Sequence, residues 1–363
     1  MGMENSPRSN LRKAISNLAS PAILFYAVPW LMVLLVIGTY LQKDLGLYTA
    51  QKMFFGSWIV WLGPLPLPGG YATLLVITLC LLSKFLFQSP WRAGQAGIIV
   101  THLSILVLLI GGGITAATQR EGFLSIKEGQ SGNTVSDYHA RQILVLKDGK
   151  QIAAVDFDAL QKGDVIAKDS LPFTAKIESL CRNCRPGPVK NPEGRHGLAE
   201  QINLQSAPEE KENEANLSGF MMSISGSKQD GMYAAMEEIP HKPEIGAYSF
   251  AIQRTQHVLP FEIELKDFKR NLHPGTDVAS GFSSNIIVKD NGVEWPAVIS
   301  MNEPLRYKGY TFYQASFSIR PDGEFSVLSV VQNKGRVFPY IAGALLMFGL
   351  ILHIVLRLKG RNA

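Results

Sequence analysis

The chain has 363 residues, a mean hydropathy of +0.09 and 18% charged residues. That charged fraction is low for a water-soluble protein and high for a bundle lying wholly inside a membrane, so two environments are predicted. The net charge of +5 does not indicate nucleic acid binding, because many Lys and Arg residues flank apolar segments and act as topology signals. Hydrolase and kinase chemistry are disfavoured too, since no nucleophile elbow, phosphate loop or paired-carboxylate pattern occurs.

Four apolar segments are long enough to cross a bilayer as helices, which takes roughly 20 residues each. They cover residues 22–41, 71–88, 96–116 and 338–356. The first is expected to remain as an anchor, because it is too long for a signal peptide and has no small-residue cleavage site before Lys43. Within the 42–70 loop, the apolar stretch 48–70 predicts a short interfacial or re-entrant helix, with Trp58 and Trp61 at headgroup level.

Basic residues predict the orientation of these spans. They lie before the first span, between the second and third, and after the fourth, at Arg8, Arg12, Lys13, Lys84, Arg92, Arg357, Lys359 and Arg361. By the positive-inside rule this side is cytoplasmic, which assigns residues 1–21, 89–95 and 357–363 to the cytoplasm. Residues 42–70 and 117–337 are then extracytoplasmic. We expect a multi-pass protein of the cell (inner or cytoplasmic) membrane, in contact with lipid, with its large domain on the periplasmic side.

Residues 117–337 are predicted to form a mainly-β domain, sandwich-like or barrel-like. Short runs of alternating polarity are separated by turn residues. Asp-Gly and Asn-Gly steps within 147–150 and 290–292 are strong hairpin signals. The acidic stretch 206–216 predicts a mobile loop. The expected fold class is therefore an integral membrane protein with four transmembrane helices and a large extracytoplasmic β domain.

His102, in the third apolar segment, is the first candidate functional residue. An ionisable side chain at that depth is a functional hypothesis by default, and neutral imidazole is a common iron ligand. The alternative is a single hydrogen bond from His102 to a carbonyl of a neighbouring helix or to Thr101 or Ser104. At ~1.5 Å per residue, His102 is expected ~9 Å and His353 ~6 Å from the cytoplasmic side.

That similar depth leaves two hypotheses for His353. One is an intrachain haem held by His102 and His353. The other is a histidine stabilised by the helix dipole beside Arg357 and Lys359.

Cys181 and Cys184 form a C-x-x-C motif in the outer region. Arg182 and Arg185 would favour a reactive thiolate, which makes the pair a redox candidate for exchange with a substrate or a thioredoxin-like carrier. No βαβ pattern follows the motif, and a second cysteine pair for a metal site is missing, so a structural disulfide is the alternative. No metal other than haem iron is expected.

The remaining histidines offer no metal-ligand spacing and are expected at the surface; they are His139, His196, His241, His257 and His273. Of these, His273 lies in a turn where it could face haem or substrate.

Two blocks of sequence resemble ResB-type (CcsB-type) cytochrome c biogenesis proteins. The first runs from Thr101-His102-Leu103-Ser104 through the glycines 111–113 to Gly122-Phe123-Leu124 and Glu128-Gly129. The second is the Asn-x-Pro-Leu block of residues 301–307, followed by Gly309-Tyr310 and Phe312-Tyr313-Gln314-Ala315-Ser316. The order of three spans, outer domain and last span also resembles this family, and Phe54-Phe55, Ser57 and 66–70 resemble its short form. Residues 182–248 carry no such resemblance.

The resemblance implies a subunit of the System II cytochrome c synthetase complex, which moves haem across the membrane for covalent attachment to apocytochrome c. It implies haem b as a transiently bound, transported cofactor and a ResC-like or CcsA-like membrane partner. It also maps His102 onto the family's transmembrane histidine, an axial haem ligand paired with a histidine of that partner.

The haem-presenting surface of that partner is a tryptophan-rich loop, whereas the five Trp residues here are scattered. This chain is therefore expected to be a non-catalytic or co-catalytic subunit of a haem lyase, with no catalytic residue assigned. Two alternatives remain open: a cytochrome b-type electron-transfer subunit using His102 and His353, and a structural chaperone of the partner.

Overall fold

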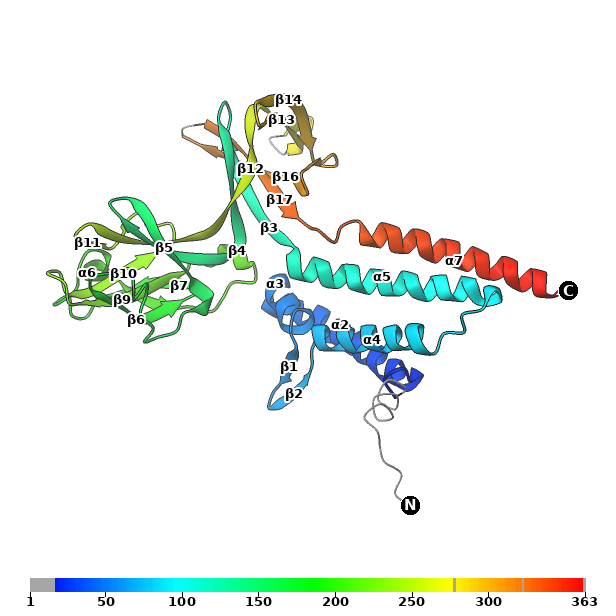
Figure 1. The fold of residues 1–363 in the computed structure, drawn as a ribbon. Coiled ribbons are helices and arrows are strands. Elements are labelled where there is room, and N and C mark those ends of the chain that lie inside the picture. The colour runs from blue at the N-terminus through cyan, green and yellow to red at the C-terminus, as the bar shows by residue number, and fades with distance from the viewer. Residues whose placement is uncertain (1–16, 277–278, 322, 362–363) are drawn as a thin grey trace, which may run out of the picture. The chain divides into compact units, whose positions relative to one another are not determined.

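The computed structural model describes residues 17–276, 279–321 and 323–361. The basic residues Arg8, Arg12 and Lys13 lie outside the described residues. The chain divides into two compact units, one comprising Met1–Gln119 and Gln332–Ala363, the other Arg120–Val331. The long helices belong to the first unit, and the second is built from strands (Figure 1).

Four helices in the described part of the first unit are long and apolar enough to cross a membrane. They are α2 (Pro21–Leu45), α4 (Gly70–Phe87), α5 (Ala96–Thr118) and α7 (Phe338–Arg361). Helix α2 begins with Pro21 after Ser20, whose side chain accepts a hydrogen bond from the Ala22 N–H, a common N-terminal pattern. Only 11–28% of the residues in their most apolar windows are buried, which suits helices that face lipid or other helices. The predicted set of four membrane helices is confirmed.

Helices α5 and α7 pack closely through small residues. A Cβ added to Gly97 would lie 2.3 Å from the backbone nitrogen of His353, and one added to Gly349 would lie 2.8 Å from that of Thr101. Residue numbers rise along α5 and fall along α7 between these contacts, so the two helices are antiparallel. In membranes, helices associate by such close backbone approach, because lipid provides no hydrophobic drive between them.

Gly97→Ala should therefore destabilise the helical unit, because its methyl group has no room beside α7. We expect a loss of about 1–3 kcal/mol, the usual cost of overpacking, measured by thermal unfolding of the purified chain in detergent. Gly113→Ala is the matched control, since open space surrounds Gly113 on the same helix. Equal melting temperatures for the two variants would contradict the proposed packing.

The connection between α2 and α4 differs from the prediction. The helical part, α3 (Leu47–Ala50) with the π-helix η1 (Gln51–Phe55), is followed by a hairpin of β1 (Ile59–Leu62) and β2 (Leu65–Pro68). A short helix within residues 48–70 was predicted and α3 with η1 supplies one, but the hairpin after it was not predicted. Pro64, Pro66 and Pro68 lack the N–H groups that a helix interior needs, and Gly63 takes a positive φ of 63° in the turn.

The second unit contains a ten-stranded sheet with the order β14-β13-β12-β4-β3-β17-β16-β15, in which β11 also pairs with β12 and β5 with β4. Its strands are β3 (Arg120–Lys127), β4 (Ser131–Lys147), β5 (Lys150–Asp156), β11 (Glu244–Ile245), β12 (Tyr248–Leu272), β13 (Ala279–Asp290), β14 (Val293–Ser300), β15 (Leu305–Tyr307), β16 (Tyr310–Arg320) and β17 (Gly323–Gln332). A three-stranded sheet has the order β10-β9-β6, with β6 (Thr174–Cys181), β9 (Gly219–Ser225) and β10 (Gly231–Met236). Strands β7 (Cys184–Gly187) and β8 (Asn203–Ser206) form a separate pair. The second unit also contains the short helices η3 (Phe157–Ala159), α6 (Leu198–Gln201) and η4 (Asn213–Ala215). In the first unit, η2 (Ala93–Gln95) precedes α5.

Strands β4 and β12 contribute to two separate hydrophobic cores. The first core is formed by β3, β4, β12, β13, β14, β16 and β17, with Val135, Leu265 and Phe312 among its buried residues. In the second core, Ile143 and Phe250 of the long strands pack with side chains from β6, β9 and β10. The second core thus lies between two sheets, as in a sandwich. The prediction of a mainly-β domain in addition to the membrane helices is confirmed.

Both predicted hairpins are present. Strands β4 and β5 turn through Asp148 (φ 49°) and Gly149 (φ 75°), and β13 and β14 through Asn291 (φ 48°) and Gly292 (φ 83°). Positive φ at both central residues is the type I′ geometry that these dipeptides favour.

Candidate functional site

The orientation of the His102 ring is fixed by its own helix. Its Nδ1 lies 2.8 Å from the carbonyl oxygen of Ile98. A carbonyl oxygen only accepts hydrogen bonds, so Nδ1 carries a proton, and in the neutral ring Nε2 is then the nitrogen with the lone pair. The hydroxyls of Thr101 and Ser104 instead donate to the carbonyls of Gly97 and Thr101. Neither hydrogen bond predicted as the alternative for His102, to the carbonyl of a neighbouring helix or to Thr101 or Ser104, is present, because the ring bonds to a carbonyl of its own helix.

His102 does not lie on the α5 face that contacts α7. That face carries Gly97, beside the backbone of His353, and at 3.6 residues per turn His102 is rotated about 140° away from Gly97. His102 shares its stripe with Leu106 and Leu109, four and seven residues further on, which belong to a cluster with residues of α4. The imidazole therefore lies on the side of α5 that is directed toward α4.

His353 also lies at a different level from His102. Because it stands beside Gly97, it is five residues, or about 7.5 Å, nearer the start of α5 than His102. The expected similarity in depth is not met, since α7 continues to Arg361 and its last turns extend past the predicted end of the span. The Nδ1 of His353 is buried and has no hydrogen-bond partner among the described residues. The structure does not bring the two imidazoles together.

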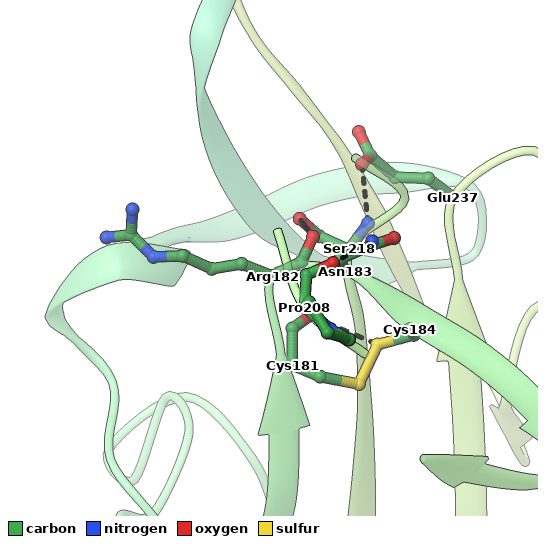
Figure 2. The surroundings of a disulfide bond; sticks show 7 residues. All are labelled: Cys181, Arg182, Asn183, Cys184, Pro208, Ser218 and Glu237. Atoms are coloured by element: carbon green, nitrogen blue, oxygen red, sulfur yellow. Dashed lines mark hydrogen bonds between the residues drawn. A yellow bond between two sulfur atoms is a disulfide. The ribbon is translucent and has the colours of Figure 1, made fainter. Parts of the chain in front are cut away.

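Cys181 and Cys184 are joined in a disulfide with a Cα–Cα distance of 5.4 Å. The bond connects the end of β6 to the start of β7, and the two residues are only 6% and 3% exposed. Arg182 pairs with Asp158 at 2.9 Å, and its side chain points away from the sulfur atoms (Figure 2). An attacking thiolate needs access to a sulfur atom, so this burial favours a structural disulfide over exchange.

The disulfide turn holds both ends of the segment that was predicted to be a mobile loop. We name residues 207–217 the clasped loop. At its start, Ala207 N–H donates to the Asn183 carbonyl (2.8 Å) and the Asn183 amide donates to the Pro208 carbonyl (2.6 Å). At its end, Cys184 N–H donates to the Leu217 carbonyl at 2.8 Å. The segment is thus anchored at both ends by one turn.

The clasped loop lies over two buried charged groups. Arg141 Nε donates to Glu237 Oε2 at 3.2 Å, and its Nη2 donates to the Asn216 carbonyl at 3.0 Å. The same carboxylate oxygen accepts the Ser218 N–H at 2.9 Å (Figure 2). Arg254 donates to the Glu214 carbonyl at 2.8 Å. Burial, followed by repulsion from Arg141, lowers the pKa of Arg254.

These charges lie where the pairing of β4 and β12 is interrupted. The register passes from Arg254 opposite Arg141 to Gln256 opposite Ser136, which leaves a bulge in β4. The Asp137 side chain accepts the backbone N–H groups of residues 139 and 140, both at 2.8 Å, and so holds the bulge. Bulges re-aim side chains, and this one accompanies the buried ion pair.

Glu237→Gln should destabilise the β unit, because it leaves the buried Arg141 guanidinium without its counter-charge. Removing one partner of a buried pair typically costs about 3–5 kcal/mol, to be measured by denaturant unfolding of the full chain. The double variant Arg141→Met with Glu237→Met should recover part of this loss. Glu210→Gln, at an exposed side chain, is the control. A loss no larger than that of the control would mean that the ion pair is dispensable.

Replacing both Cys181 and Cys184 by Ser should loosen the clasped loop. For so short a disulfide loop we expect a stability loss of about 2 kcal/mol, together with faster amide hydrogen exchange over residues 207–217. Exchange in the β13–β14 hairpin should not change and is the internal control. Unaltered exchange in the clasped loop would show that the hydrogen bonds hold it without the disulfide.

The remaining histidines mostly lie at the surface. His241 and His273 are exposed, and His257 is partly exposed. His139 Nδ1 lies 3.0 Å from Asn213 Oδ1 in the clasped loop, and His196 stacks on Tyr233 with ring centroids 5.1 Å apart. Among the described residues, no three His, Cys, Asp or Glu side chains form a metal-binding group.

One further polar cluster includes two residues of the 301–308 region. Tyr307 donates from its hydroxyl to Asp290 Oδ2 at 2.5 Å, and Lys308 forms an ion pair with the same oxygen. These contacts, that of Lys308 first, lower the pKa of Asp290. The sequence marked Asp290 only as a turn residue, and it gave no signal for Arg141, Glu237 or Arg254.

Residues 245–330 match the sequence model of the ResB-like family. Among curated proteins, Protein NrfI of Wolinella succinogenes is 22% identical to this chain over 356 residues. The alignment covers 95% of this chain but 35% of NrfI, so the chain spans about a third of that relative's length. The matched region includes β12 to β16 and most of β17.

Proposed function

We propose that this protein, a member of the ResB-like family, is a membrane subunit for cytochrome c biogenesis that carries haem b toward covalent attachment to apocytochrome c. The proposed complex is that of System II, and the second subunit is a ResC-like or CcsA-like membrane protein. Haem is cargo here, and the protein's own residues bind and orient it. The role is delivery and assembly, with no bond-making step assigned to this chain.

The observation that carries the proposal is the state of His102. Its Nδ1–H is committed to the Ile98 carbonyl, and Nε2 keeps its lone pair. Histidines that ligate metals characteristically donate their other ring N–H to such a carbonyl, which fixes the tautomer and the ring orientation. A partly buried imidazole on a membrane helix, with its ring oriented in this way, fits one axial position of haem iron.

The second axial ligand is proposed to come from the partner. His353 of α7 lies beside Gly97, which is at a different level of α5 from His102 and on a different face of that helix. At the level of His102 this chain therefore offers one imidazole. A shared site also suits a carrier, because haem held between two subunits is released when either imidazole withdraws. The intrachain pair of a cytochrome b is not supported by this geometry.

We further propose that the β unit lies on the extracytoplasmic side and contacts apocytochrome c or the partner. Lys84 and Arg92 flank the connection between α4 and α5, and Arg357 and Lys359 lie in the last turns of α7. The antiparallel packing of α5 and α7 brings these groups to one end of the helix pair. By the positive-inside rule that end is cytoplasmic, which leaves the chain between α5 and α7 outside. A thioredoxin-like carrier gains no support, since the disulfide is buried.

His102→Ala should abolish the haem bands of the purified complex, because it removes one axial ligand. The measurement is the absorption spectrum of the chain, alone and co-expressed with its ResC-like partner. His353→Ala is the matched control and should leave the spectrum unchanged. His102→Ala with retained yield and retained partner binding excludes a folding defect.

Other outcomes lead to different functions. Haem bands in the isolated chain that require both His102 and His353 would establish the cytochrome b alternative. Spectra unaffected by His102→Ala would remove the ligand role and leave a structural chaperone of the partner.

A further inference from the structure

The β1–β2 hairpin exposes an apolar face. In the paired register Ile59 stands opposite Pro68 and Trp61 opposite Pro66, so these four residues share one face. Ile59 and Trp61 are 54% and 57% exposed. The alternate residue Val60 is buried in a cluster with Leu34 of α2 and Phe54 of η1. A hairpin face directed to water would carry polar side chains at the outward positions.

The sequence on both sides of this hairpin carries no charged residue. No Asp, Glu, Lys, Arg or His occurs between Lys52 and Lys84, although the hairpin has several exposed side chains. Its two ends continue directly into α4 and, through η1 and α3, into α2. In space the hairpin stands at the first residue of α4 and packs against Trp30 and Leu34 in the middle of α2. The start of the membrane helix α4 is where we expect the interface between lipid and water.

The outer edge of β2 is free of backbone donors. The backbone N–H groups of Leu65 and Leu67 are directed to β1, and the backbone nitrogens of the alternate residues are directed outward. These alternate residues are Pro66 and Pro68, whose nitrogens carry no hydrogen. The outward carbonyl of Pro68 accepts a hydrogen bond from the Trp30 indole N–H at 2.9 Å. An open strand edge cannot lie in lipid with unsatisfied donors, and it would offer those donors to another strand. This edge avoids both problems.

The hairpin is also held firmly against the helices. A Cβ on Gly69 would lie 2.3 Å from the carbonyl oxygen of Ser57, and one on Gly70 would lie 2.5 Å from that of Phe55. Gly69 N–H donates to the Trp58 carbonyl at 2.9 Å. The exposed face is thus presented at a set position relative to α4.

We propose that the β1–β2 hairpin is a lipid-docking element that lies in the headgroup layer with Ile59, Trp61, Pro66 and Pro68 directed to the acyl chains. Trp favours this depth because its ring is apolar and its N–H is polar. The hairpin fixes the height of α2 and α4 in the bilayer. The blocked edge of β2 disfavours the addition of a strand from a protein partner.

The test uses fluorescence quenching in vesicles of phosphatidylethanolamine and phosphatidylglycerol. One full-length variant keeps Trp61 as its sole tryptophan, and the control keeps Trp295, which packs on Tyr307 in the β unit. Bromine near the ester end of the acyl chains should quench the Trp61 emission strongly, as expected for a tryptophan at the headgroup boundary, and the Trp295 emission little. Equal quenching of both residues by bromine would overturn the proposal.

Because the sole-tryptophan chain lacks the Trp30 hydrogen bond, a second variant preserves it. Trp61→benzoylphenylalanine in the otherwise unchanged chain should crosslink to lipid when illuminated in the cell membrane. Ile152→benzoylphenylalanine, at an exposed position of β5, is the control and should give no lipid adduct. Crosslinks from position 61 to another protein in place of lipid would show that a protein covers this face, and the proposal would be wrong.

Discussion

The antiparallel pairing of β4 with β12 is the constraint on which the β unit depends. These strands, of 17 and 25 residues, place side chains in both hydrophobic cores. A strand exposes alternate residues to opposite faces, so a shift of one residue would turn every buried side chain outward. The bulge at residues 137–140 breaks this alternation between the two cores, and the Asp137 carboxylate stabilises it.

The bulge is accompanied by the buried side chain of Arg141, whose hydrogen-bond partners come from other segments of the chain. Arg141 finds Glu237 from the end of β10 and a carbonyl of the clasped loop. That loop is held by hydrogen bonds to the disulfide turn at its two ends. Because an unpaired buried charge is far more costly than an exposed one, the disulfide turn, the clasped loop and the ion pair stabilise one another. The C-x-x-C motif has a structural explanation here that needs no redox chemistry.

In the helical unit the governing requirement is that backbone groups be satisfied within lipid. Small residues let α5 and α7 approach each other, and prolines remove donors from the free edge of β2. The polar side chain of His102 is also satisfied within its own helix, because its Nδ1–H donates to the Ile98 carbonyl. This bond fixes the orientation of the ring on α5.

The sequence by itself determined the four apolar helices, the mainly-β domain, its two type I′ hairpins and the family resemblance, because these depend on local periodicity and short motifs. It also identified His102, since an imidazole in an apolar run stands out without knowledge of its neighbours. The hairpin after η1 was missed because an aromatic, apolar run is ambiguous between helix and strand, and its prolines, which exclude a helix interior, are also unfavourable within a strand unless it lies at an edge. Only the tertiary structure decided which face of α5 carries His102, that His353 stands at another level, and that Arg141, Glu237 and Arg254 meet. The physical reason is that these facts depend on which residues distant in sequence pack together, and a single sequence shows the period of a helix or strand but not the partner of each face.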